Sequence, residues 1–421
     1  MNINRSYGTV SFAIVALLMF SGADTLRLRG SDTTGVSKDK GLPIHWSPTK
    51  NIVWKTPLPG RGGSSPITLK DRIYLTAYTG YGIDRGENLG KQEDLRHHVL
   101  CLNRADGKLL WEKKSKALLP EQDFTKSHID LHGYASSTPV TDGENLFVYF
   151  GRSGVQAYDL DGKLLWQFET GTGLNGWGSA ASPIIFEDLL IVNASVESET
   201  LFALNKKTGK VVWKADGIRE SWSTPAIVDI PGGGQELVVS MHSRVVGYDP
   251  KTGEELWSCK GIPDYTVPMV VTANGVVYIS GGRSSMTMAI RAGGRGNVTK
   301  THKLWSLTKG CKVPSPLIHD GLLYWVSNLE TAGCIDAKTG KIVYHKRLSK
   351  RGAFYGASMM AEGRIYAISK ERGAVVLAAG KEFKQIARNY LDDKSLFNGT
   401  PVISNSQLLL RSDRFLYCIG K

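Results

Sequence analysis

A unit of about 43 residues recurs along this chain of 421 residues. Each unit opens with a small or β-branched residue that is followed, in every unit but one, by proline. The eight openings are Ser65-Pro66, Thr138-Pro139, Ser182-Pro183, Thr224-Pro225, Val267-Pro268, Ser315-Pro316, Ala357-Ser358 and Thr400-Pro401. Successive openings lie 73, 44, 42, 43, 48, 42 and 43 residues apart. Such a period is typical of a propeller or a solenoid, and it outweighs the two or three domains that length alone would suggest.

One unit shows the strand pattern in full. Strand-forming runs cover Thr224 to Asp229, Glu236 to Ser240, Arg244 to Tyr248 and Glu255 to Ser258, and a tight turn, Pro250 to Gly253, joins the last two. Short strands separated by turn residues predict an antiparallel meander of four strands.

A tryptophan follows the Thr-Gly or Asp-Gly turn in most units. The series is Trp111, Trp166, Trp213, Trp257 and, after an irregular turn, Trp305, with Tyr344 in the seventh place. A four-stranded sheet with two apolar faces must stack against neighbours, so we expect blades around an axis, with the indoles packed between their outer strands.

The two ends of the repeat region complement each other. Trp54 carries the outer-strand signature in Ile52 to Thr56 but has no strands before it, and the last unit ends after Phe415 to Ile419, one strand short. We therefore predict that residues 52–56 complete the eighth blade and close the ring, which removes the open edges.

The turn-and-tryptophan motif resembles a known repeat. Ala203-Leu-Asn-Lys-Lys-Thr-Gly-Lys-Val-Val-Trp213 and Tyr248-Asp-Pro-Lys-Thr-Gly-Glu-Glu-Leu-Trp257 are similar to the tryptophan-docking repeats of the pyrroloquinoline-quinone-like propeller superfamily, over roughly residues 50–420. The resemblance implies an all-β, eight-bladed propeller of four-stranded antiparallel blades. The superfamily contains quinoprotein dehydrogenases and the non-catalytic BamB-like propellers, to which this chain is closest in size. Fold therefore does not settle function.

The sequence before the repeats is divided into two segments. Arg5, the apolar run from Val10 to Phe20 and the small residues Ser21 to Ala23 predict a signal peptide over residues 1–23. We interpret residues 24–50 as a polar N-terminal tether and residues 51–421 as a single propeller. An exported protein is expected, periplasmic or extracellular, with no transmembrane segment in the mature chain.

The cysteine content and the net charge give weaker constraints on structure and function than the repeat does. The five cysteines include no CxxC and no vicinal pair, and the pattern leaves open a buried, reduced set or a Cys101–Cys418 or Cys259–Cys311 disulfide. The formal net charge of +13 favours anionic partners at long range. No run of Lys and Arg interleaved with aromatic residues occurs, so we expect no nucleic-acid partner.

The upper face of the propeller is predicted to carry the binding site. Both large insertions, Thr79 to His97 and Ser115 to Gly133, fall on connections that lie above the blades. One aromatic residue also precedes the first strand in six units, in the set Tyr134, Trp177, Trp222, Tyr265, Tyr355 and Phe397. These side chains either rim the channel mouth and grip a ligand, with Arg219 and Glu199 nearby, or plug the spaces between blades.

His128-Ile-Asp130-Leu-His132 is the one cluster with metal-like content. If the segment is extended, alternation places His128, Asp130 and His132 on one side, where they would suit a zinc or copper ion. The alternative is a loop that contains two histidines by chance.

Two functional hypotheses are compatible with the sequence. The sequence contains no nucleophile elbow, HExxH, phosphate loop or catalytic carboxylate pair. We therefore expect a monomeric, non-catalytic propeller without a cofactor that binds a protein, a peptide or a cell-envelope glycan on its top face. The alternative is a dehydrogenase that uses pyrroloquinoline quinone and Ca²⁺. The resemblance implies vicinal cysteines and an acidic and amide calcium ligand set for such enzymes, and this chain has no vicinal cysteines.

Overall fold

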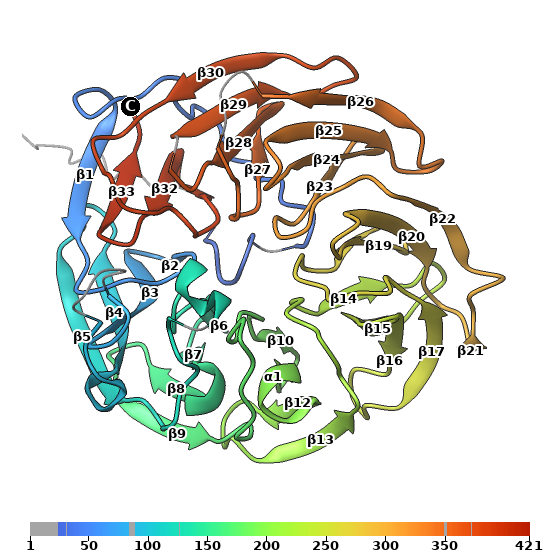
Figure 1. Ribbon diagram of the computed structural model, residues 1–421, viewed down its shortest axis with the longest axis horizontal. Coiled ribbons are helices and arrows are strands. Elements are labelled where there is room, and N and C mark those ends of the chain that lie inside the picture. Colours follow the sequence, from blue (N-terminus) through green and yellow to red (C-terminus); the bar gives the residue numbers. More distant parts are fainter. Residues whose placement is uncertain (1–23, 31, 84–88, 126, 349–351, 372) are drawn as a thin grey trace, which may run out of the picture.

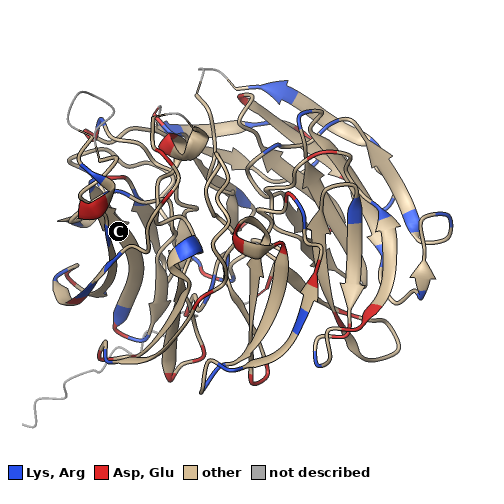
Figure 2. Ribbon diagram, turned by 60° about the horizontal axis from the view of Figure 1, so that its bottom comes forward, with Lys and Arg blue, Asp and Glu red and all other residues tan. Residues whose placement is uncertain are grey.

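Eight β-sheets stand around a central axis in the computed structural model, which describes residues 24–421 except 31, 84–88, 126, 349–351 and 372 (Figure 1). Each sheet has four antiparallel strands, which pair in chain order in every sheet but the one that contains β1, and one sheet has a fifth strand. The prediction of an eight-bladed, all-β propeller is confirmed. Basic and acidic residues are scattered over the loops and outer strands (Figure 2).

The first four blades follow one another in chain order, counterclockwise in Figure 1. Blade 1 contains β2 (Ile67–Leu69), β3 (Arg72–Thr79), β4 (Arg96–Asn103) and β5 (Leu109–Lys116). Blade 2 contains β6 (Val140–Thr141), β7 (Asn145–Tyr149), β8 (Val155–Asp159) and β9 (Leu164–Phe168). Blade 3 contains β10 (Ile184–Phe186), β11 (Leu189–Ala194), β12 (Thr200–Asn205) and β13 (Val211–Asp216). Blade 4 contains β14 (Ala226–Asp229), β15 (Gln235–Met241), β16 (Arg244–Tyr248) and β17 (Glu255–Lys260).

The other four blades complete the ring. Blade 5 contains β18 (Val271–Ala273), β19 (Val276–Gly281), β20 (Met286–Arg291) and β22 (Lys303–Leu307), and its β21 (Gly296–Asn297) joins blade 4. Blade 6 contains β23 (Leu317–His319), β24 (Leu322–Val326), β25 (Thr331–Asp336) and β26 (Ile342–Arg347). Blade 7 contains β27 (Met359–Ala361), β28 (Arg364–Ile368), β29 (Ala374–Ala378) and β30 (Gln385–Asn389). Blade 8 contains β31 (Val402–Ser404), β32 (Gln407–Arg411), β33 (Phe415–Ile419) and β1 (Ile52–Pro57).

The N-terminal strand closes the ring. β1 pairs antiparallel with β33, with Trp54 opposite Cys418 and Pro57 opposite Phe415. The predicted closure by residues 52–56 is therefore confirmed, and blade 8 gains the outer strand that its own unit lacks.

Short helical turns lie in the upper connections. They are η1 (Gln92–Asp94), η2 (His128–Leu131), η3 (Gly151–Ser153) and α1 (Ser195–Ser198). Among the described residues, no helix is long and apolar enough to cross a membrane. The predicted signal peptide, residues 1–23, lies outside the described residues.

The residue that opens each unit links one blade to the next. The amide of Ser65 donates to Thr138 Oγ1 at 3.0 Å, and the amide of Thr138 donates to Ser182 Oγ at 2.9 Å. The ring closes in the same way, because the amide of Thr400 donates to Ser65 Oγ at 2.9 Å. A hydroxyl at this position thus satisfies a buried amide of the preceding blade, which explains why Ser or Thr recurs there.

The tryptophans pack between blades as predicted. The indole N–H of Trp213 donates to the carbonyl of Pro250 in the next blade at 3.1 Å, and that of Trp166 donates to Lys206 at 3.0 Å. Apolar clusters fill the remaining space between neighbouring sheets. All five cysteines are buried free thiols, so neither of the two disulfides left open above forms.

Residues 24–50, interpreted above as a polar tether, lie against the propeller. The carbonyl of Leu26 accepts from the amide of Thr141 at 3.0 Å, and the carbonyl of Gly35 accepts from the amide of Met360 at 2.8 Å. These partners lie in the first strands of blades 2 and 7. The segment therefore crosses the lower end of the channel, where inner-strand backbone groups need partners.

Candidate functional site

A cavity of about 260 Å³ occupies the upper part of the central channel. Its wall is made by the opening residues of the blades, including Ser65, Thr138 and Ser182. Leu28 of the N-terminal segment also lines it. Because residues 24–37 cross the lower end of the channel, Leu28 forms a floor and the cavity faces the upper side.

Four of the six predicted aromatic residues line this cavity, namely Trp177, Trp222, Tyr265 and Tyr355. The ring centroids of Trp177 and Tyr265 are 5.9 Å apart, and those of Trp222 and Tyr265 are 6.4 Å apart at nearly a right angle. Trp222 is buried, and its indole N–H donates to the carbonyl of Gly178 at 2.6 Å. Trp177, Trp222 and Tyr265 thus form a continuous aromatic surface of the cavity wall, and Tyr355 adds a fourth ring to the lining.

Tyr134 and Phe397 lie between blades instead. Tyr134 is buried, packs edge-on against Tyr78 with centroids 5.3 Å apart, and donates its hydroxyl to the carbonyl of Gln122 at 2.6 Å. Phe397 is buried with its ring 6.2 Å from that of Tyr417. Neither side chain lines the cavity, so these two positions match the alternative of plugs between blades.

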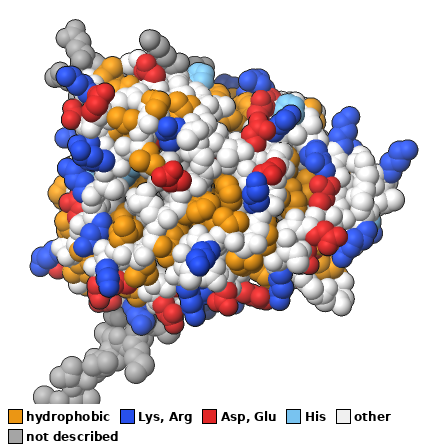
Figure 3. Space-filling view, turned by 90° about the horizontal axis from the view of Figure 1, so that it is seen from below, with side chains coloured by type: hydrophobic (Ala, Val, Ile, Leu, Met, Phe, Trp, Pro, Cys, Tyr) orange, Lys and Arg blue, Asp and Glu red, His pale blue; other side chains and the backbone are white. Residues whose placement is uncertain are grey.

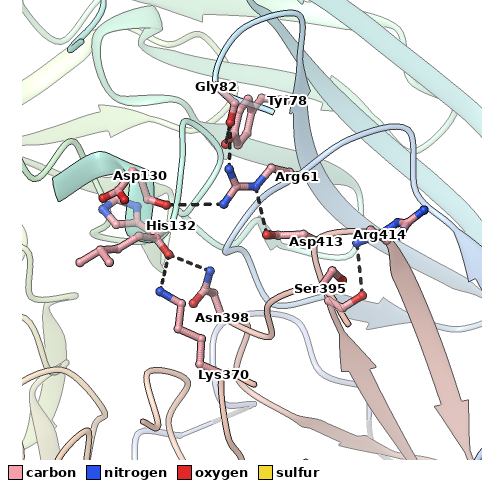
Figure 4. Close-up of polar contacts among 12 residues, drawn as sticks. Arg61, Tyr78, Gly82, Asp130, His132, Lys370, Ser395, Asn398, Asp413 and Arg414 are labelled. Atoms are coloured by element: carbon pink, nitrogen blue, oxygen red, sulfur yellow. Dashed lines mark hydrogen bonds and ion pairs between the residues drawn. The ribbon is translucent and has the colours of Figure 1, made fainter. Parts of the chain in front are cut away.

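The second insertion crosses the cavity mouth as a strap, residues 128–132. On one side, the ring of His128 stacks on Trp177 with centroids 4.2 Å apart. On the other side, the carbonyl of Leu131 accepts from Lys370 Nζ at 3.2 Å and from Asn398 Nδ2 at 2.9 Å (Figure 4). The strap therefore joins blade 3 to the connections that follow β28 and β30.

A buried ion pair at the junction of blades 8 and 1 supports the strap. Arg61 Nε binds Asp413 Oδ2 at 3.0 Å, and both side chains are less than a tenth exposed. The same guanidinium donates to the carbonyls of Gly82 at 2.9 Å and Asp130 at 3.5 Å (Figure 4). No sequence pattern predicts this pair, because Arg61 and Asp413 lie outside any motif and 352 residues apart.

The predicted metal cluster is not present. The expectation required an extended segment, but His128–Leu131 forms the single 3₁₀ turn η2, so alternation does not hold. The ring nitrogens of His132 are 2.5 Å from Ser136 Oγ and 2.6 Å from the carbonyl of Trp177, and burial lowers the pKa of this imidazole. Among the described residues, no three His, Cys, Asp or Glu side chains lie where they would hold a metal ion together.

The cavity has a cationic character. In the described part of the chain its lining includes the half-buried Lys312 and no Asp or Glu. Asn328 and Asn398 add amide groups. The predicted pair Arg219 and Glu199 lies outside the lining, as an exposed ion pair with Nε and Oε2 3.0 Å apart.

Two acidic residues, Glu197 and Glu121, lie beside the strap, and no sequence pattern predicted that they form a pair. Glu197 is buried and accepts hydrogen bonds from Tyr149, at 2.5 Å, and Ser179. Burial, together with the charge of Glu197, raises the pKa of Glu121 to about 8. Both carboxyl groups line a hollow of about 20 Å³, room for little more than a water molecule.

Comparison with known proteins identifies the family of this chain. The family model of the outer membrane protein assembly factor BamB matches residues 95–346. The chain belongs to the BamB family. The structure of BamB from Moraxella catarrhalis has a TM-score of 0.61 to this chain at 14% identity, covering 88% of this chain and 97% of that one. The computationally designed Ika8 protein has a TM-score of 0.60 at 12% identity, with 88% and 100% covered. At such identities these two structures show the shared fold alone.

A curated relative outside BamB also matches. Tetrathionate hydrolase of Acidithiobacillus ferrooxidans is 22% identical over an alignment of 357 positions that covers 76% of this chain and 65% of the relative. This BamB-family chain thus spans about two thirds of the length of that enzyme.

Proposed function

We propose that this BamB-family propeller is an exported binding protein that holds a polypeptide partner on its upper face. One carboxylate-bearing side chain or chain end of the partner enters the cavity. The observation that carries the proposal is the lining, which combines four aromatic rings with Lys312 and no acidic side chain among the described residues. Export is supported by the sequence of residues 1–23 and by the family to which the chain belongs.

The shape of the cavity favours a short inserted group over a long glycan. Leu28 blocks the channel below and the strap crosses part of the mouth, so a partner enters only from above. Aromatic rings provide flat apolar surface, and the ammonium of Lys312 provides attraction for a carboxylate in a site with little water. The partner's remaining residues would lie on the loops around the mouth.

The alternative cofactor does not fit this donor set. The cavity offers the amides of Asn328 and Asn398 but, among the described residues, no carboxylate for Ca²⁺. The five cysteines are buried outside the lining. We therefore propose a function without quinone or calcium.

A second candidate is hydrolysis of a small sulfur anion. It is favoured by the similarity to tetrathionate hydrolase and by the cationic cavity. Incubating the protein with tetrathionate and measuring substrate loss tests this candidate directly. If tetrathionate is lost with the parent protein but not with a Lys312 variant, that result would support hydrolysis over the binding function.

The binding function is tested by capture of envelope polypeptides on immobilised protein, with identification by mass spectrometry. Trp177→Ala and Lys312→Glu are expected to release a polypeptide that the parent protein retains. Arg219→Ala, which breaks an exposed ion pair outside the cavity, is the matched control and should retain it. Equal retention by all four proteins would contradict the proposal, provided that their melting temperatures agree. Titration with pyrroloquinoline quinone and Ca²⁺ tests the alternative.

A further inference from the structure

The outer edge of blade 4 already carries an added strand. β21 (Gly296–Asn297) leaves blade 5 and pairs in parallel with β17, with Ser258 opposite Asn297. The amide of Val298 donates to the carbonyl of Ser258 at 2.8 Å, and the amide of Lys260 donates to Thr299 Oγ1 at 2.9 Å. The outermost strand of a blade in this propeller is therefore able to accept a further extended segment.

β5 presents the same backbone groups on blade 1. It pairs with its inner neighbour in the register that β17 has, and both pairs carry a bulge just before the tryptophan. Glu112 therefore corresponds to Ser258, and Lys114 corresponds to Lys260. The carbonyl of Glu112 and the amide of Lys114 consequently point away from the sheet, as their counterparts do in blade 4.

No described strand covers this edge, and its side chains are apolar at one end. β5 is the terminal strand of its sheet, and Leu109 and Leu110 are 52% and 46% exposed. The corresponding apolar residue of blade 4, Leu256, is partly buried. Figure 3 shows a wall of the propeller on which apolar side chains lie between charged ones.

The positive charge on β5 determines which kind of partner segment its edge attracts. Lys113, Lys114 and Lys116 lie on the strand, while its only acid, Glu112, is bound by His98 Nδ1 at 2.5 Å. β5 is also the longest outer strand, with eight residues. We propose that the edge of β5 is a docking site for an extended, acidic segment of a partner protein. The segment adds to blade 1 as a parallel strand, as β21 adds to blade 4.

This site lies on the wall of the propeller, so it stands independently of what the cavity binds. The test titrates the full chain with a blocked eight-residue peptide of alternating valine and glutamate, and with its valine and lysine counterpart. Hydrogen exchange measured by mass spectrometry reports where the peptide lies. The acidic peptide is expected to bind and to slow exchange at the Lys114 amide, and the basic peptide is expected not to bind.

Two variants separate strand addition from other effects. Lys114→Pro removes the outward amide at an edge position where proline is tolerated, and should abolish binding. The charge reversal K114E with K116E keeps the backbone and should weaken binding about tenfold. The matched control is K346E with R347E on β26, another exposed basic outer strand, and it should leave the affinity unchanged.

Three results would overturn the proposal. The first is absence of binding, or binding without protection of residues 112–116. The second is that the charge reversal on β26 weakens peptide binding as much as the reversal on β5 does, which would mean that the protein attracts the peptide without specificity for β5. The third is self-association of the free protein that Lys114→Pro abolishes, because it would assign the edge to a second copy of this chain.

Discussion

The indole of Trp213 in blade 3 lies against Gly253 of blade 4, so close that a Cβ on the glycine would meet the ring at 2.5 Å. The same contact joins Trp166 to Gly209 and Trp305 to Gly340. In each case the glycine also has a positive φ, between 71° and 75°. The tight turn of one blade and the tryptophan of the preceding blade are thus two halves of one interface, which explains why they recur together.

Gly253→Ala is expected to lower the free energy of unfolding by about 2 to 4 kcal/mol, because backbone strain adds to a clash with a buried ring. Gly321→Ala is the matched control, since Gly321 has a similar φ of 70° but open space where the Cβ would lie. It should cost about 1 kcal/mol. Chemical denaturation measures both, and equal losses would show that the indole contact contributes nothing.

Thr138→Val tests the hydrogen-bonded ring of opening residues. The substitution keeps the shape of the side chain but leaves the buried amide of Ser65 without its acceptor, so it should cost about 1 to 3 kcal/mol. Thr49→Val on the exposed N-terminal segment is the control and should change stability by less than about 0.5 kcal/mol. A neutral Thr138→Val would mean that the amide finds another partner.

The pH dependence of stability should reveal the raised pKa of the Glu121 carboxyl. Its pKa is raised from 4.5 to about 8, so the folded protein holds a proton that the unfolded chain releases. This contribution to stability is complete below about pH 4.5 and is lost as the pH rises through 8. Glu121→Gln keeps a neutral side chain and should flatten the fall in melting temperature between these pH values. The control, Glu254→Gln in an exposed turn, should leave the fall in melting temperature unchanged. If the fall is also unchanged in Glu121→Gln, Glu121 is not the group whose pKa is raised.

The fold was predictable because its determinants repeat. The opening hydroxyl, the turn glycine and the tryptophan each act between neighbouring blades, so every unit carries the same local pattern. The closing strand was predictable for the same reason, since Trp54 shows the motif without its preceding strands. The extra strand β21 was not foreseen, because Gly296 and Asn297 show no strand-forming pattern.

The site was only partly predictable. The aromatic positions follow the repeat, but whether a ring faces the channel or a neighbouring blade depends on insertions. Tyr134 is covered because the first insertion brings Tyr81 to within 5.8 Å of it. The floor at Leu28 and the contacts of Leu131 with residues 239 and 267 positions away leave no periodic trace in the sequence.

The strap should loosen when its two anchors on the far side of the mouth are removed. In a Lys370→Met, Asn398→Leu double variant the carbonyl of Leu131 loses both donors, while the stack of His128 on Trp177 remains. Amide exchange over residues 128–133 is expected to accelerate about tenfold, because two hydrogen bonds to one carbonyl are lost.

A matched pair of variants checks that the effect is local. Lys207→Met and Lys251→Met change exposed lysines in the lower turns and should leave exchange over residues 128–133 as in the parent protein. If exchange is also unchanged in the double variant, the strap is held by the contacts of His128 and His132 with Trp177 and of Asp130 with Arg61. If instead exchange accelerates in every blade, Lys370 and Asn398 support the propeller as a whole and not the mouth of its cavity.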